Sequence, residues 1–354
     1  MKKIFISFVA LAAIAACSKT EVQYENSAEI AFAPAVKNIT KAAINSGYPD
    51  QPLRVFANYG ELEPGTDVTQ DNIDEFETEF LKNAKFIKKT VEVGNASITA
   101  WGGEGDGYSW PNNGSLVFAG YAVPTTGTVG TSQTYDFTED KLEIAGYTQS
   151  TDTDNTFDLA WFGRTVKSHN NKTNPTTTVN VTLSHALSWI EIQVKGEGTT
   201  IAEGNPWRIK TVTMNNVANT GKVACVGSGA NHATWSALGE ANNSIAIFSG
   251  DQPLSTDGKA KVIENVNAGT LVIPQTPTAV DATEPVATLT VTYTYNSPAG
   301  SEMPTQTTTV PLVVDGGWKS GNKYIYTLTF KSSEILVVPT YGAWYEVYQS
   351  VTVE

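Results

Sequence analysis

The chain has 354 residues and carries 36 acidic against 23 basic side chains, a formal charge of −13 at pH 7. So strong a negative charge argues against binding to nucleic acid or to anionic lipid, and it is typical of a soluble exterior. A single hydrophobic core seldom organises this many residues, so we expect two domains.

The first residues predict export and lipidation. Lys2 and Lys3 precede an apolar run that is too short to span a bilayer, which is typical of a signal peptide over residues 1–16. The run ends in Leu-Ala-Ala-Ile-Ala-Ala directly before Cys17, and this ending resembles the lipobox of bacterial lipoproteins. We therefore expect Cys17 to be acylated as the first mature residue, with 17–27 as a polar tether; the alternative is an ordinary signal peptide. Cleavage would remove two lysines and no acid, so the formal charge would change from −13 to −15.

Alternating apolar and polar residues predict a series of short strands over most of the chain. The alternation is clearest at 179–183, 190–194 and 324–330, where it places one row of side chains in a core. Turn residues separate the strands, as in Pro-Asn-Asn-Gly at 111–114. Only the stretch 73–80 favours a helix, because an isoleucine and two phenylalanines recur there at helical spacing.

Many short strands with almost no helix predict an all-β fold of two tandem β-sandwich domains. We place the N-terminal domain at 28–176 and the C-terminal domain at 177–354. The break between them is expected in the threonine-rich loop 170–178.

The residues that would carry chemistry are absent or badly spaced. The three histidines lie at no metal-ligand spacing. Three aspartates over 152–158 suggest a calcium loop, but Phe157 and Gly163 stand where its glycine and its last acid would be. The sequence contains neither a phosphate-binding glycine loop nor a nucleophile elbow. We therefore predict no catalytic residue, no metal and no cofactor, and conclude that the chain is not an enzyme.

The second cysteine, Cys225, follows Val223 and Ala224 and precedes Val226. An apolar setting of this kind favours a buried thiol over a reactive one. Because a lipidated Cys17 could not pair with it, no disulfide is expected.

Several segments in series resemble the fimbrillin family of Bacteroides-type bacteria, the subunits of type V pili and related surface lipoproteins. They follow one another in the family's order over residues 29–330, behind the lipobox. The segments are Glu-Ile-Ala-Phe at 29–32, Thr-Lys-Ala at 40–42, Tyr-Ser-Trp-Pro at 108–111, Leu-Val-Phe-Ala-Gly-Tyr-Ala-Val-Pro at 116–124, Asp-Leu-Ala-Trp at 158–161, Leu-Ser-His-Ala-Leu-Ser at 183–188, Leu-Val-Ile-Pro-Gln-Thr at 271–276 and the run from Trp318 to Phe330.

The resemblance implies a pair of transthyretin-like sandwiches that assemble by strand exchange. In pilus-forming members a trypsin-like protease cuts after the first strand, here 28–36, in which Ile30 and Phe32 would face the core. Lys41 is the first candidate for the cut and Lys37 the second, while Arg54 lies in a predicted strand. The alternative for Lys41 is a solvated loop lysine with no such role.

The tail 334–354 is the candidate donor strand, the segment that would fill the vacated place in a neighbouring subunit. One face of its extended form would carry Tyr345, Val347, Val351 and Val353. An ordinary last strand of the chain's own second domain is the alternative, and it is favoured for 335–338. The expected partners are thus other pilus subunits and the outer membrane, which the lipid anchor would reach.

Eight tryptophans favour an alternative from another functional class. Aromatic platforms bind sugar rings, and Trp101, Trp110 and Trp344 are candidates in a glycan-binding surface lipoprotein, although Trp110 and Trp318 also match packing positions of the family. A further alternative is a pilus tip or accessory adhesin that does not polymerise. Host proteins or glycans would be the partners in these cases, and each alternative keeps the protein at the cell surface.

Overall fold

The computed structural model describes residues 29–36, 51–62, 69, 71–93, 96–124, 129–152, 157–168, 178–201, 206–227, 232–263, 269–277, 286–295, 304–331 and 335–343. Within these ranges nearly all of the regular structure is strand, with short 3-10 turns at η1 (Ile73–Glu75) and η3 (Gly198–Ile201). The prediction of an all-β fold is confirmed. No helix of these described ranges is long and apolar enough to cross a membrane.

The strands are, in chain order, β1 (Ala31–Val36), β2 (Leu53–Gly60), β3 (Thr78–Val93), β4 (Ala96–Gly103), β5 (Ser115–Ala122), β6 (Ser132–Asp136), β7 (Lys141–Thr148), β8 (Ala160–Ser168), β9 (Val179–His185), β10 (Ser188–Gly196), β11 (Arg208–Val217), β12 (Thr220–Val226), β13 (Ala233–Ser236), β14 (Asn243–Pro253), β15 (Lys261–Val262), β16 (Thr270–Val272), β17 (Thr288–Thr294), β18 (Gln306–Pro311), β19 (Asn322–Phe330) and β20 (Ile335–Ala343).

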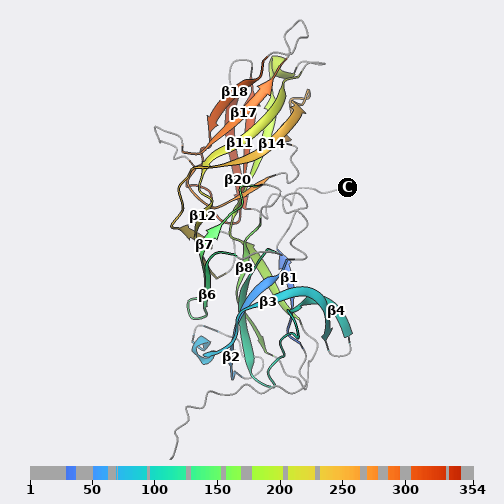
Figure 1. The fold of residues 1–354 in the computed structure, drawn as a ribbon, viewed down its shortest axis with the longest axis vertical. Helices are drawn as coiled ribbons and strands as arrows, with labels where there is room; N and C mark the ends of the chain where they lie inside the picture. The colour runs from blue at the N-terminus through green and yellow to red at the C-terminus, as the bar shows by residue number, and fades with distance from the viewer. Residues whose placement is uncertain are drawn as a thin grey trace, which may run out of the picture.

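The N-terminal half is a closed barrel whose strands run in the order β1-β4-β3-β2-β5-β8-β9. Figure 1 shows it in the lower half of the molecule. Every residue of β5, in the middle of this order, is buried. Because the barrel is closed, each of its strands has a neighbour on both sides. The strands together enclose one continuous core.

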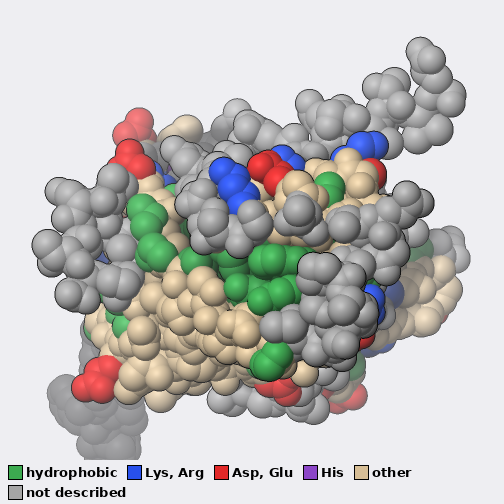
Figure 2. Space-filling model, turned by 90° about the horizontal axis from the view of Figure 1, so that it is seen from above, with side chains coloured by type: hydrophobic (Ala, Val, Ile, Leu, Met, Phe, Trp, Pro, Cys, Tyr) green, Lys and Arg blue, Asp and Glu red, His purple; other side chains and the backbone are tan. Residues whose placement is uncertain are grey.

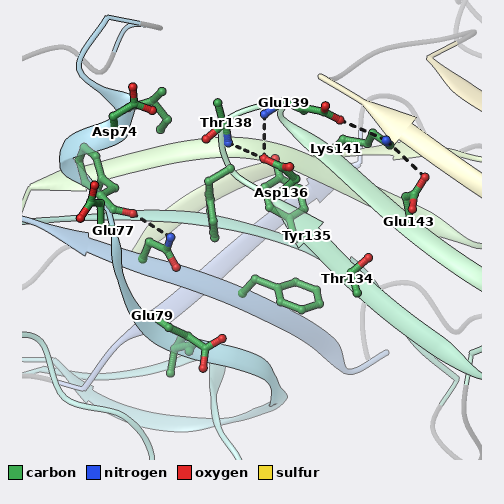
Figure 3. A pocket seen from close by; sticks show the side chains of 16 residues that line it. Asp74, Glu77, Glu79, Thr134, Tyr135, Asp136, Thr138, Glu139, Lys141 and Glu143 are labelled. Carbon is green, nitrogen blue, oxygen red and sulfur yellow. Dashed lines mark hydrogen bonds and ion pairs between the residues drawn. The ribbon is translucent and has the colours of Figure 1, made fainter.

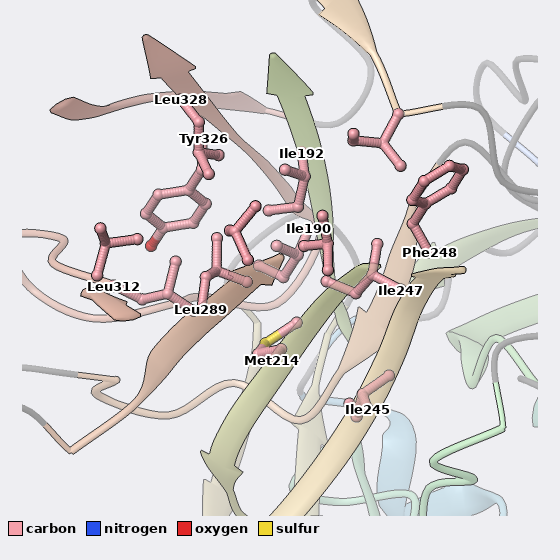
Figure 4. Packing of buried hydrophobic residues seen from close by; sticks show 14 of the residues in the cluster. Ile190, Ile192, Met214, Ile245, Ile247, Phe248, Leu289, Leu312, Tyr326 and Leu328 are labelled. Carbon is pink, nitrogen blue, oxygen red and sulfur yellow. The ribbon is translucent and has the colours of Figure 1, made fainter. Parts of the chain in front are cut away.

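The C-terminal half is a sandwich of two sheets. One sheet has the order β15-β10-β19-β20, with β16 also paired to β10, and the other has the order β14-β11-β17-β18. Their inner faces meet in one cluster, in which Ile190 and Ile192 of β10 pack with Leu289 of β17 and Tyr326 of β19 (Figure 4). The apolar residues that alternate with polar ones at 190–194 and 324–330 are the residues that fill this core.

A fourth sheet joins the two halves. It has the order β13-β12-β7-β6, in which β6 and β7 precede the barrel strand β8 while β12 and β13 follow the sandwich strand β11. Figure 1 shows β6, β7 and β12 along one side of the molecule between the halves. Backbone pairing from Thr220 with Thr148 to Val226 with Lys141 crosses the junction. A shared core lies against this sheet and includes Trp161 of the barrel and Trp189 of the sandwich.

One sequence prediction is wrong. The helix expected over 73–80 is a single 3-10 turn followed by β3, because Thr78 and Glu79 pair with Tyr59 and Asn58 of β2 and this pairing overrides the local spacing. β9, which follows the expected break at 170–178, pairs with β1 and β8, and its alternate side chains enter the barrel core.

The position of Cys225 in the shared sheet predicts that its thiol reacts slowly in the native protein. Cys225 is fully buried in the junction core, as the sequence indicated, and burial raises the pKa of its thiol. In a chain that starts at Ser18, iodoacetamide at pH 8.5 should leave Cys225 unmodified under native conditions and should alkylate it completely in guanidinium. Mass spectrometry over several hours measures both.

The matched control moves the thiol by one residue. Val226 is 46% exposed, so Val226→Cys in a Cys225→Ala background should react readily in the native protein. Equal native reactivity of the two proteins would contradict a closed junction.

Candidate assembly site

β1 closes the barrel by pairing on both of its edges. Ala31 and Phe32 lie antiparallel to Gly102 and Trp101 of β4. From Phe32 to Val36 the strand runs parallel to β9, over Val179 to Leu183. Within the described residues, β1 is therefore the connection between β4 and β9, and the ring of strands closes through it.

The side chains of β1 also occupy the middle of the barrel core. Phe32 of β1 and Ile30, which directly precedes the strand, are both 0% exposed, as predicted from the sequence. The Phe32 ring meets Phe86 of β3 and Phe118 of β5 edge to face, with centroids 4.9 and 5.2 Å apart, and lies 6.1 Å from Phe162 of β8. Burial of a side chain of this size stabilises the fold by about 1.5–3 kcal/mol, and each edge-to-face pair adds about 0.5–1.5 kcal/mol.

An ion pair fixes the start of β1. The Glu29 carboxylate lies 2.7 Å from Lys89 Nζ of β3, and this amine also donates to the carbonyl of Gly103 at 2.7 Å. The next amide, of Ile30, donates to the carbonyl of Tyr108 at 2.6 Å. The glycine-rich turn after β4 has a physical reason here, since a Cβ at Gly107 would stand 2.3 Å from Glu29 Oε1.

The other residues expected to act in assembly lie outside the described residues. These are Cys17, both candidate cut sites Lys37 and Lys41, and the donor positions Tyr345, Val347, Val351 and Val353. Arg54 is described and lies in β2 between β3 and β5, where its guanidinium donates to the carbonyl of Asn83 at 3.1 Å. A residue paired on both sides of its strand is a poor protease substrate.

The first half of the candidate donor tail is a strand of its own chain. β20 pairs antiparallel with β19 along its whole length, from Ile335 with Phe330 to Ala343 with Asn322. This is the arrangement that the sequence favoured for 335–338, and it extends five residues further, to 343. The part of the tail that could reach another subunit with β20 in place is therefore 344–354.

His185 has a structural partner. Its Nδ1 lies 2.6 Å from Oδ2 of Asp158, and both side chains are buried. The pair ties the end of β9 to the segment that leads into β8. Asp158, one of the three aspartates of the suggested calcium loop, is thus directed inward to this histidine.

The tryptophans of the glycan-binding alternative are mostly core residues. Trp110 is 1% exposed and Trp101 is 9% exposed, and the indole N–H of Trp101 donates to the carbonyl of Gln51 at 2.7 Å. Trp318 is also buried. Trp344 lies outside the described residues. Neither Trp101 nor Trp110 therefore offers a ring face to a sugar.

The sequence reasoning missed a stack of half-buried rings at the opposite end of β11 from the junction. Trp207 lies nearly parallel to Tyr293, with an interplanar angle of 9°, and stacks on Tyr295 with centroids 4.9 Å apart. Figure 2, which views the C-terminal half from above, shows hydrophobic side chains gathered near the centre of that face. A tryptophan just before a strand carried no periodic signal that could have indicated this stack.

Comparison with known proteins now identifies the family. The fimbrillin-like family model matches residues 61–344, most of the chain, and the chain belongs to this family. Its members are structural proteins, so the conclusion that the chain is not an enzyme is confirmed. No curated protein matches the chain.

One solved structure shares the fold at low sequence identity, and others resemble the chain more distantly. A fimbrial protein from Bacteroides vulgatus is 16% identical with a TM-score of 0.59, over 89% of this chain and 99% of that one. A candidate cell adhesion protein from Bacteroides uniformis is also 16% identical, with a TM-score of 0.48 over 89% and 98% of the two chains. Another from Bacteroides ovatus is 14% identical, with a TM-score of 0.45 over 90% and 99%.

The position of Phe32 predicts a large effect of truncation. Phe32→Ala should lower the free energy of unfolding by about 3–5 kcal/mol, because it leaves a cavity among three other rings. The half-buried Phe80, at the margin of the same core, provides the control, and Phe80→Ala should cost only about 1–2 kcal/mol. Guanidinium unfolding of both variants measures the difference, and equal losses would contradict a central role for β1 in the core.

Proposed function

We propose that this protein is a structural subunit of a cell-surface pilus and supports adhesion. It is exported as a lipoprotein through Cys17 and reaches the outer membrane by its lipid anchor. Proteolysis after Lys41 or Lys37 then frees β1, and an extended strand of another subunit takes its place. Membership of the fimbrillin-like family and the fimbrial protein of similar fold support the pilus role.

The observation that carries the proposal is the position of β1. A six-residue strand joins the two ends of the barrel, and its Phe32 stands at the centre of the barrel core. Loss of such a strand would expose the backbone groups of β4 and β9 and an apolar cavity between them. An incoming strand would satisfy both, with its backbone giving affinity and its alternate side chains giving register.

The donor in this proposal is the tail 344–354. Its Tyr345, Val347, Val351 and Val353 would enter the groove that β1 leaves between β4 and β9 of a neighbouring subunit. Ten extended residues span about 33 Å, enough to line the groove of a neighbouring barrel. With β20 paired to β19, the tail would leave the subunit from the end of β20.

A second candidate is a tip or accessory subunit that joins a pilus without polymerising. The pairing of β20 within its own chain favours it, because half of the candidate donor segment 334–354 is already occupied. A subunit of this kind would still accept a strand of another subunit in the place of β1, but it would have no donor strand of its own.

Trypsin treatment of the soluble chain from Ser18 distinguishes these candidates. A stalk subunit should be cut once, after Lys37 or Lys41, and should then form high-mass polymers, as shown by N-terminal sequencing and size-exclusion chromatography. A clean cut without polymers would assign the tip or accessory role. A chain that resists cutting there and stays monomeric would contradict strand exchange.

The double variant Val347→Asp and Val351→Asp is the control for the donor. It should be cut like the parent chain and stay folded, but it should form no polymers, because charges cannot enter an apolar groove. Polymers formed by this variant would rule out the tail as donor.

A further inference from the structure

The two ladders that hold β1 differ in length. The parallel ladder with β9 runs from Phe32 to Val36, whereas the antiparallel ladder with β4 contains only Ala31 and Phe32. β4 itself stays paired with β3 along its whole length, back to Ala96. Among the described residues, the part of β4 that precedes Trp101 therefore has a partner strand on the β3 side alone.

The hydrogen bonds of β4 show which of its residues face β1. One residue beyond the strand, the amide of Glu104 donates to the carbonyl of Lys85, on the β3 side, at 2.9 Å. In an antiparallel ladder the N–H and C=O of one residue point to the same side, and this side alternates from residue to residue. Ser97 and Thr99 are an odd number of residues from Glu104, so their backbone groups point away from β3. They meet no strand there among the described residues.

Pro34 of β1 explains why the ladder with β4 stops. If the register of Phe32 with Trp101 continued, Pro34 would lie opposite Thr99. The N–H of residue 34 would then donate to the carbonyl of Thr99, but proline has no N–H. Proline in a sheet is typical of an edge. A seam therefore remains between residues 33–36 of β1 and residues 97–100 of β4.

The side chains along this seam leave it accessible. Ser97 and Thr99 are exposed, and Ala33 and Pro34 are half-buried. Ile98, whose side chain lies on the other face of β4, is half-buried against a small apolar cluster. A strand added at the seam would form backbone hydrogen bonds with β4 and would cover part of this apolar surface.

Other open features of the N-terminal half do not adjoin β1. The far edge of the β3–β4 hairpin, formed by β3 after Phe86, is separated from β1 by β4. A cleft of about 860 Å³ beside the β6–β7 hairpin is lined by residues of β2, β3, β6 and β7, and by no described residue of β1, β4 or β9. Figure 3 shows Lys141 of this cleft between Glu139 and Glu143, with which it pairs at 3.1 and 3.4 Å.

We propose that the seam is where the donor strand of a second copy of this chain, its tail 344–354, first binds. This inference rests on the strand exchange proposed above. The incoming strand would pair with the free backbone groups of Ser97 and Thr99 while β1 still occupies the barrel. It would then extend along β4 to Trp101 and Gly102, taking the partners of Phe32 and Ala31 one after the other. By this route the apolar cavity around Phe32 is never left empty.

The test follows the uptake of a fluorescein-labelled peptide of residues 344–354. The acceptor is the soluble chain from Ser18 with Val347→Asp and Val351→Asp, which cannot donate its own tail, and it is cut with trypsin as described above. The peptide contains neither lysine nor arginine, so trypsin does not cut it. Fluorescence anisotropy measures the rate at which the acceptor takes up the peptide.

Two matched proline variants locate the start. Thr99→Pro removes the free N–H in the middle of the seam and no hydrogen bond to β3, and it should slow uptake roughly tenfold. Thr90 lies directly opposite Thr99 in the ladder, so its N–H points to the far edge of the hairpin. Thr90→Pro should therefore leave the rate within about twofold. Equal slowing by both variants would show a general weakening of the hairpin and overturn the seam as the start.

A second pair of variants closes the seam without placing a proline. Pro34→Val supplies the N–H that the carbonyl of Thr99 can accept, so β1 should pair further with β4 and uptake should be roughly fivefold slower. Ala33→Val adds a similar side chain to β1, but its backbone groups point to β9, and the rate should stay within about twofold. Uptake by Pro34→Val as fast as by the parent acceptor would overturn the proposal.

The outcomes separate this proposal from the function on which it rests. If the parent acceptor takes up the peptide and neither Thr99→Pro nor Pro34→Val slows the uptake, strand exchange stands but does not begin at the seam. If no acceptor takes up the peptide, strand exchange through the tail is contradicted, and the seam as its start is contradicted with it.

Discussion

The insertion of β1 between β4 and β9 is the contact on which the N-terminal half depends. Without it the barrel has two unpaired edges, and the rings of Phe86, Phe118 and Phe162 lose the phenylalanine that they surround. The strand is short, and one of its two ladders is parallel, the less stable arrangement per residue. A strand that contributes this much to the core through so few residues suits a role in which it is replaced.

The shared sheet imposes the second constraint. Because β7 pairs with β12 across the junction, the barrel and the sandwich cannot separate without breaking backbone hydrogen bonds and exposing the core around Trp161 and Trp189. If the protein is a pilus subunit, as proposed, this junction would let the two halves carry load together.

The local parts of this account could be predicted from the sequence. Period-two alternation gave the strands of the sandwich, and Ile30 and Phe32 could be placed in the core from their segment alone. The long-range parts could not, because no local pattern shows that β9 pairs with β1 or that β12 pairs with β7. The helical spacing at Ile73 and Phe76 was misleading for the same reason, since both side chains are buried beside a strand whose pairing with β2 decides the local structure.

The most direct test of the central claim is whether the place of β1 can be refilled. A chain that begins at residue 51 is mixed with a labelled synthetic peptide of residues 28–36, and the bound peptide is measured after gel filtration. The account predicts stoichiometric, long-lived uptake of this peptide and little uptake of the same peptide carrying Phe32→Ala. A folded chain that takes up neither peptide, or both equally well, would contradict a replaceable strand anchored by Phe32.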